Sequence, residues 1–409
     1  MKVIYKLKLS FLFLFLTSLP FEYWDPFGIS SYFTITKFIG LSYFLLSLLD
    51  FRNNFKYNQI KSLLIPLSCI YIYYVLQGFN NPTVESINSV FYFTLVQNIV
   101  LFWLVSNDII RNPKIISKLF LSIIVGTVIM GVLIYLRIGV DPTYDLGYFR
   151  VSFFGSNPNN IGDIVALSIF LIGYLIIKRR EYFGRTTWLL IFLSPLLVAI
   201  LGLTGSRGAL LTLFGGILIF ILLQKGKRGK RYLYIIVGIC ILYVLFDKLI
   251  ENNVMDKRIT NAIEEKNLGG RDIIWKESLQ IFYENPVFGI SRTGYKSEIK
   301  KRIGEYLDTH NILLYFMVTG GIIGLILYSW FLLILYKKAY SYYSFFGDSL
   351  LLSILVIYFI IAFKSGGAIE SKLLWFLTSV ITGIGTNNLK KVKETNLIKN
   401  NDRSYTLMI

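Results

Sequence analysis

The chain has 409 residues, of which 55% are hydrophobic, 16% aromatic and only 16% charged. This composition excludes an ordinary soluble domain. The formal net charge of +18 does not indicate nucleic-acid binding, because the basic residues gather in short segments between apolar runs, as the positive-inside rule requires. Cys69 and Cys240 both lie inside apolar runs, where they predict neither a disulfide framework nor a metal site.

In chain order, apolar runs of about 18 residues or more recur along the sequence, each long enough to cross a hydrocarbon core of roughly 30 Å. The first predicted span is at the N-terminus, where three lysines and the apolar stretch Leu9–Leu19 resemble a signal peptide; no small-residue cleavage site precedes Pro20, which indicates that the span is uncleaved. The other predicted spans are 32–49, 62–79, 86–106, 115–136, 159–177, 186–203, 207–223, 231–250, 310–336, 347–363 and 372–387. The sequence therefore predicts an all-α polytopic membrane protein with about 12 transmembrane helices, folded as one bundle over residues 1–389.

The distribution of charge predicts the orientation of this bundle. Counted from a cytoplasmic N-terminus, every short inner segment is basic, whereas the short outer segments carry few cations. The acidic residues of those outer segments are Glu22, Asp25, Glu85 and Glu370. Because Lys and Arg in short loops set orientation, both termini are predicted to be cytoplasmic. Residues 390–409 then form a polar cytoplasmic tail that is predicted to be disordered.

The same count places three segments on the extracytoplasmic face, namely 137–158, 204–206 and 251–309. The last is too long for an ordinary connection between helices. One amphipathic pattern within it consists of Trp275, Leu279 and Phe282, and it stops at Asn285-Pro286. A second consists of Ile299, Ile303 and Leu307. We expect two short helices here that lie along the outer membrane surface.

Four arginines of these outer segments are candidate ligands for an anionic group: Arg150, Arg207, Arg271 and Arg292. Arginine forks match phosphate oxygens bidentately, so several on one face would suit a pyrophosphate. Arg207 lies between glycines where it opens a predicted helix; a cation there is costly unless it is paired, functional or snorkels to headgroups. Arg150 precedes a proline turn at which Asn159 is predicted to cap the next span. The alternatives are a plain surface loop for Arg150 and exposure to solvent for Arg271 and Arg292.

His310 is the only histidine of the chain, and it is predicted to lie in the first turn of a span. Its neighbours Asp308 and Asn311 are polar, and imidazole exchanges a proton near neutral pH. Asp308 could orient or polarise His310, or it could be the N-cap of the helix. A lone histidine is more often structural than catalytic. The three glycines that follow, Gly320, Gly321 and Gly324, are interpreted as sites of close helix packing.

These motifs together resemble those of the O-antigen ligase and polymerase superfamily, membrane glycosyltransferases that use polyprenyl-diphosphate-linked glycans. The matching pieces, in order, are Arg150 with Asn157-Pro158-Asn159, Thr204-Gly205-Ser206-Arg207-Gly208, Gly270-Arg271-Asp272, Pro286-Val287-Phe288-Gly289 and His310-Asn311. One departure is that Gly289 is followed by Ile290-Ser291, where relatives often have Gly-x-Gly. The predicted topology, with a large late outer loop carrying short amphipathic helices, is likewise GT-C-like.

The resemblance implies an inverting, metal-independent glycan transfer without a cofactor, on the outer face of the bacterial inner membrane. His310, Arg207 and Arg271 would then be catalytic, with His310 as base for the acceptor hydroxyl or as a donor that positions it. Substrate binding would involve Arg150, Asn159, Arg292, Asp308 and Asn311. The implied partners are an undecaprenyl-diphosphate-linked oligosaccharide, a glycan acceptor and membrane lipids, with a chain-length regulator as a further candidate.

Two enzymatic activities share this chemistry. A polymerase moves the growing glycan onto a lipid-linked repeat unit, whereas a ligase moves the finished glycan onto lipid A core or protein. The polymerase is preferred here on prior frequency alone. A transporter such as a flippase for lipid-linked glycan is disfavoured, because the sequence indicates neither an internal repeat nor broken helices. No P-loop is present, which disfavours an ATP-driven machine.

Overall fold

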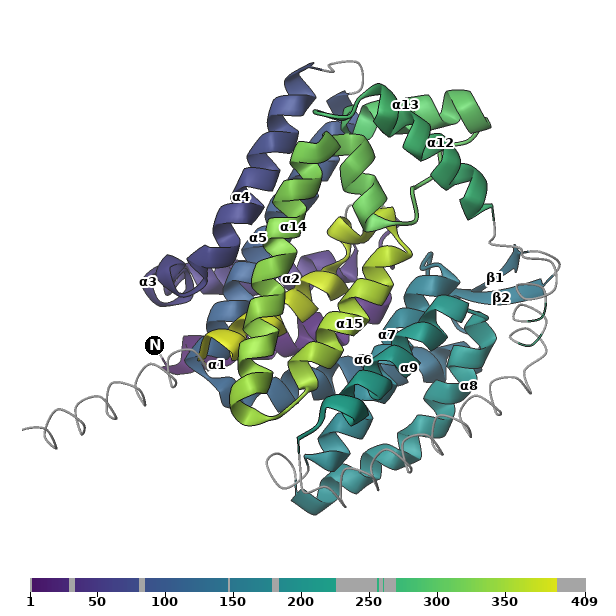
Figure 1. Ribbon diagram of the computed structural model, residues 1–409. Coiled ribbons are helices and arrows are strands. Elements are labelled where there is room, and N and C mark those ends of the chain that lie inside the picture. Colours follow the sequence, from purple (N-terminus) through teal and green to yellow (C-terminus); the bar gives the residue numbers. More distant parts are fainter. Residues whose placement is uncertain are drawn as a thin grey trace, which may run out of the picture.

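A computed structural model describes residues 2–28, 34–80, 85–145, 148–178, 184–225, 256, 260 and 270–387. These residues form a bundle of helices with one small β-hairpin at one end (Figure 1). The predicted span 231–250 and the predicted tail 390–409 lie outside the described residues, as does most of the predicted loop 251–309 before Gly270.

The described residues of the first half of the chain form six α-helices and two short 3₁₀ turns. They are α1 Lys2–Thr17, η1 Leu19–Phe21, α2 Ile35–Leu48, α3 Phe51–Asn54, α4 Tyr57–Asn80, α5 Glu85–Arg111, η3 Pro113–Ile115 and α6 Ile116–Tyr135. The second half continues with α7 Pro158–Ile177, η4 Gly184–Leu193, α8 Ser194–Thr204, α9 Arg207–Leu223, α12 Arg271–Glu284, α13 Ser291–Ile303, α14 Ile312–Phe346, α15 Leu350–Phe363, η5 Gly366–Glu370 and a helix at 372–387.

Among the described residues, six helices are long and apolar enough to cross a membrane. They are Tyr57–Gly78, Phe91–Arg111, Pro113–Tyr135, Pro158–Ile177, Thr187–Thr204 and Ile312–Phe346. Three shorter apolar helices, α2, α9 and α15, fall on predicted spans, but at roughly 1.5 Å per residue they are shorter than a typical hydrocarbon core. An α-helical membrane protein is therefore confirmed, whereas twelve spans and the outer loop remain predictions.

One small sheet departs from the expected all-helical chain. Strands β1 Val140–Asp145 and β2 Tyr148–Phe153 pair antiparallel, with Val140 opposite Phe153. The buried ring of Phe153 lies 5.4 Å from that of Phe21, and Phe154 stacks on Trp24 at 4.7 Å. The hairpin is thus packed against the segment that follows α1, where the sequence predicts only an outer connection.

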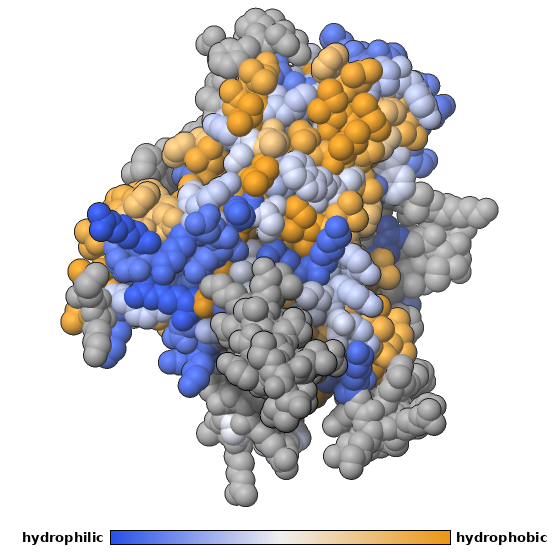
Figure 2. All heavy atoms as spheres, turned by 60° about the vertical axis from the view of Figure 1, so that its left-hand side comes forward, coloured by the Kyte–Doolittle hydropathy of each residue, from blue (hydrophilic) through white to orange (hydrophobic). Residues whose placement is uncertain are grey.

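Apolar side chains cover much of the outer surface of the bundle. Figure 2 shows orange apolar patches beside a broad hydrophilic area on one face. On α14, Ile322, Ile326 and Leu333 are exposed on one stripe at helical spacing. Exposed apolar stripes of this length suit contact with lipid rather than water.

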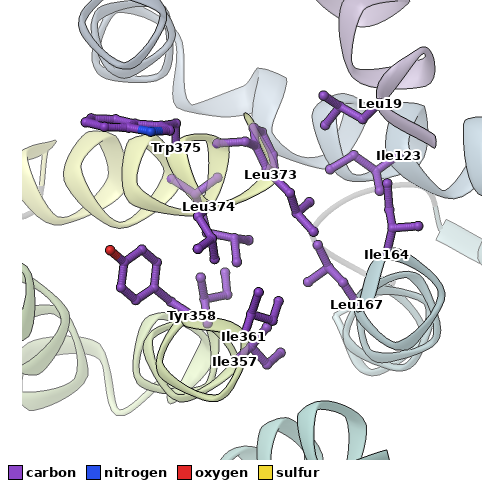
Figure 3. Close-up of a cluster of buried hydrophobic side chains, with 14 of the residues drawn as sticks. Leu19, Ile123, Ile164, Leu167, Ile357, Tyr358, Ile361, Leu373, Leu374 and Trp375 are labelled. Atoms are coloured by element: carbon purple, nitrogen blue, oxygen red, sulfur yellow. The ribbon is translucent and has the colours of Figure 1, made fainter. Parts of the chain in front are cut away.

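The interior of the bundle is apolar and is shared by helices from both ends of the chain. Figure 3 shows Leu19, Ile164, Ile361 and Leu373 meeting with other buried side chains between α7, α15 and the helix at 372–387. Gly162 of α7 lets α9 approach closely, because a Cβ at this position would lie 2.7 Å from the Cβ of Ala209. These contacts fix α7, α9 and α15 side by side.

Segments predicted to share the outer face meet at one end of the bundle. Glu22 forms an ion pair with Lys372, Arg150 of the hairpin reaches Thr204, and Arg292 reaches Glu370. We call this the hairpin end, comprising residues 20–28, 137–145, 148–158, 204–206, 270–311 and 364–372. Lys8, Asn54 and Asp108 meet at the opposite end, where Lys8 Nζ lies 2.5 Å from Asp108 Oδ1.

Within the hairpin end, helices α12 and α13 form a paired unit (Figure 1). Arg302 of α13 binds Glu284 of α12 at 2.6 Å, and Trp275 Nε1 donates to the Thr309 carbonyl at 2.9 Å. Two details of the predicted patterns are wrong. The side chains that α12 buries include Ile274 and Ile281, whereas Leu279 is 38% exposed. Helix α13 ends at Ile303, because Gly304 takes a left-handed conformation, so Leu307 lies outside it.

Helix α14 is broken at Gly321, whose φ of 61° and ψ of −160° are not helical. The loop after α12 fills the break: Ile322 N donates to the Pro286 carbonyl at 2.8 Å, and Ile290 N donates to the Val318 carbonyl at 3.0 Å. Tyr73 of α4 donates to the Gly320 carbonyl at 2.8 Å. The close packing expected at Gly320 is made against Tyr73 and Tyr74 of α4, whereas Gly321 packs against the loop after α12. The expectation of unbroken helices is wrong.

Candidate functional site

A cavity of about 630 Å³ opens at the hairpin end. Its lining comes from helix ends and connections far apart in sequence, including α2 at Lys37, α13 at Lys296 and the segment from Ser365 to Leu373. Leu19, Ile164, Ile361 and Leu373 also line it, and these belong to the apolar cluster of Figure 3. Charged side chains thus form one part of the cavity wall, and apolar side chains form another.

Ion pairs cross-link the wall of this cavity. Lys372 binds Glu22, and Arg292 binds Glu370 while its guanidinium stacks 4.6 Å from the Phe91 ring centroid. These pairs tie α13 and the start of the helix at 372–387 to the segment after α1 and to the turn η5.

Two lysines, Lys37 and Lys296, also face the cavity, both half-buried. Burial, followed by the nearby charge of Arg292, lowers the pKa of Lys296. The wall therefore offers cations to a polar or anionic ligand that displaces water from the cavity.

His310 lies beside this cavity, at the entry to α14. It is half-buried and has a φ of 48°, a left-handed conformation that histidine adopts more readily than most residues. Burial lowers its pKa, the charge of Asp308 raises it, and the charge of Arg271 lowers it. The nearby backbone of Lys364 also raises the pKa, as the smallest of these effects. The net effect lowers the pKa of His310, so the imidazole is neutral at neutral pH and can accept a proton.

The polar neighbours of His310 have separate structural tasks. The N-cap of α14 is Asn311, whose Oδ1 accepts from Leu313 N at 2.9 Å and from Leu314 N at 3.2 Å. Asp308 is therefore not the cap; its Oδ2 accepts from Gly367 N at 3.0 Å and its Oδ1 from Thr309 N at 2.9 Å. Asp308 thus joins the loop before α14 to η5 and also lines the cavity.

Arg207 is the first residue of α9, as the sequence predicts. The N-cap is Ser206, whose Oγ accepts from Ala209 N at 3.3 Å. Gly208 packs against the side chain of Lys364: a Cβ at this position would lie 2.9 Å from Lys364 Nζ. The start of α9 therefore lies against the end of α15 at Lys364.

Arg150 and Asn159 hold the hairpin to the start of α7. Arg150 is only 5% exposed, and its Nε donates to the Thr204 carbonyl at 2.9 Å. Asn159 Oδ1 accepts from Arg150 at 2.9 Å and from Ser206 Oγ at 3.1 Å. The helix cap itself is Asn157, whose side chain accepts from the backbone N–H groups of Asn159 and Asn160, which corrects the expected cap at Asn159. These bonds position the turn that presents Arg207.

The structure therefore brings the predicted residues to one end, but in two groups. Arg150, Asn159 and Arg207 gather at the start of α7 and α9, and the others gather around the loop before α14. Of the eight predicted residues, only Arg292 and Asp308 line the described cavity. His310 and Arg271 do not line it, but the charges of both Asp308 and Arg271 act on His310.

Sequence reasoning missed Asp163 and Lys364. Lys364 Nζ forms an ion pair with Asp163 Oδ1, and Thr212 Oγ1 also reaches Asp163 at 3.5 Å. Asp163 is 5% exposed inside the otherwise apolar helix α7. An ionisable residue within a predicted span is itself a signal of a site, because burying it in a membrane is costly. That signal was available for Asp163 from the sequence.

The fold and the site define a polytopic α-helical membrane protein with a charged cavity at one end of its bundle. Residues 191–329 match the family model described as O-antigen ligase. The match confirms the resemblance to the O-antigen ligase and polymerase superfamily for this part of the chain. It contains Arg207, Arg271, Arg292 and His310, and it ends within α14. No curated protein matches the chain.

Proposed function

We propose that this protein is a polysaccharide polymerase of the bacterial cytoplasmic membrane, with both termini cytoplasmic and the hairpin end facing outward. It transfers glycan from undecaprenyl diphosphate to a hydroxyl of a lipid-linked repeat unit. The observation that carries the proposal is the position of His310: half-buried, flanked by Asp308 and Arg271, and adjacent to a cavity whose volume suits saccharide units.

The chemistry that these residues support is a displacement at the anomeric carbon. The acceptor hydroxyl attacks this carbon, His310 takes the hydroxyl proton, and the bond to the diphosphate oxygen breaks with inversion. A base for this step must be neutral before the reaction, and the lowered pKa of His310 meets that requirement.

The leaving diphosphate carries the developing negative charge. Arg271 and Arg207 come from the starts of two different helices, and their guanidinium groups supply donors for phosphate oxygens. Arg207 stands at a helix N-terminus, where backbone amides also favour an anion. Arg292 and the two cavity lysines are suited to hydroxyl or acidic groups of the saccharide.

A ligase is the second candidate, because the matching family model is described as O-antigen ligase. Transport is less well supported. The break in α14 is filled by residues 286–290 of the same chain and does not open into the described cavity.

The test is reconstitution of the purified protein in liposomes with undecaprenyl-diphosphate-linked oligosaccharide. A polymerase lengthens the lipid-linked glycan when this is the only substrate, whereas a ligase produces a new glycoconjugate only when lipid A core is added. Absence of both products, together with movement of the lipid-linked glycan between leaflets, would replace transfer by transport.

A further inference from the structure

Two buried hydroxyl groups at the cavity have no hydrogen-bond partner among the described residues. Tyr315, near the start of α14, lines the cavity and is 3% exposed, and its Oη is one of these groups. Thr34, the N-cap residue of α2, lines the same cavity and is also 3% exposed, and its Oγ1 is the other. Because buried polar groups in folded proteins are nearly always hydrogen-bonded, a ligand in the cavity is suited to supply their partners.

Lys296 of α13 adds a positive charge to the same cavity. Its side chain lines the cavity and is half-buried, but its ammonium forms no ion pair or hydrogen bond with any described residue. Arg292, one helical turn earlier on α13, is by contrast neutralised by Glu370. A half-buried ammonium without a carboxylate partner favours a ligand that brings a negative charge.

Tyr315 and Lys296 border the cavity where α13 meets α14. Tyr295 of α13 and Leu314 of α14 belong to one buried apolar cluster between these helices. Lys296 follows Tyr295 in the chain, Tyr315 follows Leu314, and both line the cavity beside this cluster. The packing of the two helices therefore places a phenol hydroxyl and an ammonium on the same side of the cavity.

The four carboxylates that line the cavity already have donors. Asp308 accepts from Gly367 N at 3.0 Å and from Thr309 N at 2.9 Å. The other three are in ion pairs: Glu22 with Lys372, Glu370 with Arg292, and Asp163 with Lys364. The two buried hydroxyls and the ammonium of Lys296, in contrast, each have a proton to donate and no acceptor among the described residues. A ligand that satisfies them must present acceptor atoms.

The balance of charge indicates how much negative charge such a ligand carries. Four cations line the cavity, and Lys364 adds a fifth through its ion pair with Asp163. Five cations therefore stand against four carboxylates, which leaves one positive charge. A single carboxylate neutralises this charge, whereas a diphosphate brings more negative charge than the cavity offsets.

We propose that this side of the cavity binds the carboxylate of a uronic acid in the glycan: Lys296 pairs with the carboxylate, and the Tyr315 hydroxyl donates a hydrogen bond to it. Thr34 donates to another oxygen of the same saccharide. The inference rests on the proposed function for the ligand being a glycan, and it names the class of that glycan as acidic. Lys296 and Tyr315 are then specificity-determining residues, because a neutral analogue leaves their donors unpaired.

The probe is a tetrasaccharide of alternating glucuronic acid and N-acetylglucosamine, compared with the same tetrasaccharide after reduction of its carboxyl groups to alcohols. Titration calorimetry measures the binding of each to the full-length protein in detergent micelles. The wild type should bind the acidic form about ten-fold more tightly, the scale of one charge-assisted hydrogen bond. Lys296→Met and Tyr315→Phe should each remove most of this preference and leave the affinity for the reduced form unchanged.

Two controls separate this role from a general effect on charge or folding. Lys301→Met removes a positive charge from the same helix, but Lys301 pairs with Glu298, is 71% exposed and does not line the cavity, so the preference should persist. Without ligand, Tyr315→Phe should not lower Tm, because the hydroxyl it removes has no partner. Tyr74→Phe removes a buried hydroxyl that bonds Thr319 Oγ1 at 2.6 Å and should lower Tm.

Equal binding of the two tetrasaccharides by the wild type would overturn the proposal, as would an equal loss of preference in Lys301→Met. Inorganic pyrophosphate is the third probe. Competition between pyrophosphate and the acidic tetrasaccharide that disappears in Lys296→Met would assign these donors to the lipid diphosphate instead.

Glycan transfer is measured separately in liposomes. If no transfer occurs while the wild type prefers the acidic tetrasaccharide and the two variants lose that preference, the proposed function fails and the carboxylate site stands. If transfer occurs without any such preference, the carboxylate site fails alone. With an acidic lipid-linked oligosaccharide, Tyr315→Phe should raise KM about ten-fold with little change in kcat, as expected for loss of binding that is equal in the ground and transition states.

Discussion

Gly289 and Gly321 lie backbone against backbone: a Cβ built on Gly289 would be 2.6 Å from the nitrogen of Gly321. Both residues have positive φ, 68° and 61°. This backbone contact joins the end of the loop after α12 to the break in α14. Through this contact the paired helices α12 and α13, which carry Arg271 and Arg292, are fixed relative to the start of α14 and His310.

The first prediction concerns this contact. Gly321→Ala should lower the free energy of unfolding by about 3 kcal/mol or more, because alanine is strained at this φ and ψ and its Cβ would overlap the Val287 carbonyl oxygen. Thermal unfolding in detergent measures the effect. The control is Gly173→Ala in α7, where no atom lies within 4 Å of the new Cβ; equal melting temperatures for the two variants would refute the argument.

The second prediction concerns the proposed catalytic residues. Arg207→Ala, Arg271→Ala and His310→Ala should each reduce glycan transfer by about a hundred-fold or more, the scale expected for loss of a charge-stabilising group or a general base. The protein should still insert in the membrane at wild-type levels. Arg137→Gln removes an exposed arginine from the same end and should leave the product ladder unchanged. Wild-type product ladders from all three alanine variants would contradict the assignment of these residues as catalytic.

The third prediction concerns pH. Because the pKa of His310 is lowered by burial and by Arg271, the transfer rate should stay constant as pH falls toward 6.5, the ordinary pKa of histidine, and then decline below it. Arg271→Gln removes the cation that lowers this pKa, so the decline should begin at higher pH. Asp308→Asn removes the charge that raises the pKa, so the decline should begin at lower pH. NMR titration of His310, the only histidine, in ¹⁵N-histidine-labelled protein gives the direction of the pKa change in each variant without a measurement of activity.

The fourth prediction concerns orientation. In a background with Cys69 and Cys240 replaced by alanine, Lys300→Cys should react with an impermeant thiol reagent in intact cells or spheroplasts. Lys337→Cys, an exposed position beyond the middle of α14, should react only after lysis, because the long helix carries it to the opposite end. The reverse pattern would place the hairpin end in the cytoplasm and remove the proposed access of extracytoplasmic glycan.

The fifth prediction concerns the opposite end of the bundle. Lys8 is 1% exposed, and it donates to Asp108 Oδ1 at 2.5 Å and to Asn54 Oδ1 at 2.7 Å. Lys8→Met should destabilise the protein by about 3–5 kcal/mol, because Asp108 is left buried without its cation. The double variant with Asp108→Leu should recover part of this loss. A melting temperature of Lys8→Met equal to the wild type would show that water reaches this pair.

Much of the local structure could be predicted because it depends on neighbouring residues. The period of the apolar residues predicted α7, α9 and α12, and Asn285-Pro286 ended α12 as expected. The caps were less predictable: Asn157 caps α7 where Asn159 was expected to, and Asn311 caps α14 where Asp308 was one candidate. Adjacent polar residues compete for the same backbone N–H groups, and only the path of the preceding chain selects one.

The sequence by itself determined that this is a helical membrane protein, because the length and composition of its apolar runs leave no other way to satisfy the backbone in lipid. It also indicated which polar residues stand at the ends of those helices. Only the tertiary structure decided which of them meet. Lys364 and Asp163 are 201 residues apart, and Lys372 and Glu22 are 350 apart. Their pairing depends on close packing of helices at positions such as Gly162 and Gly208, a property of the whole bundle and not of any one segment.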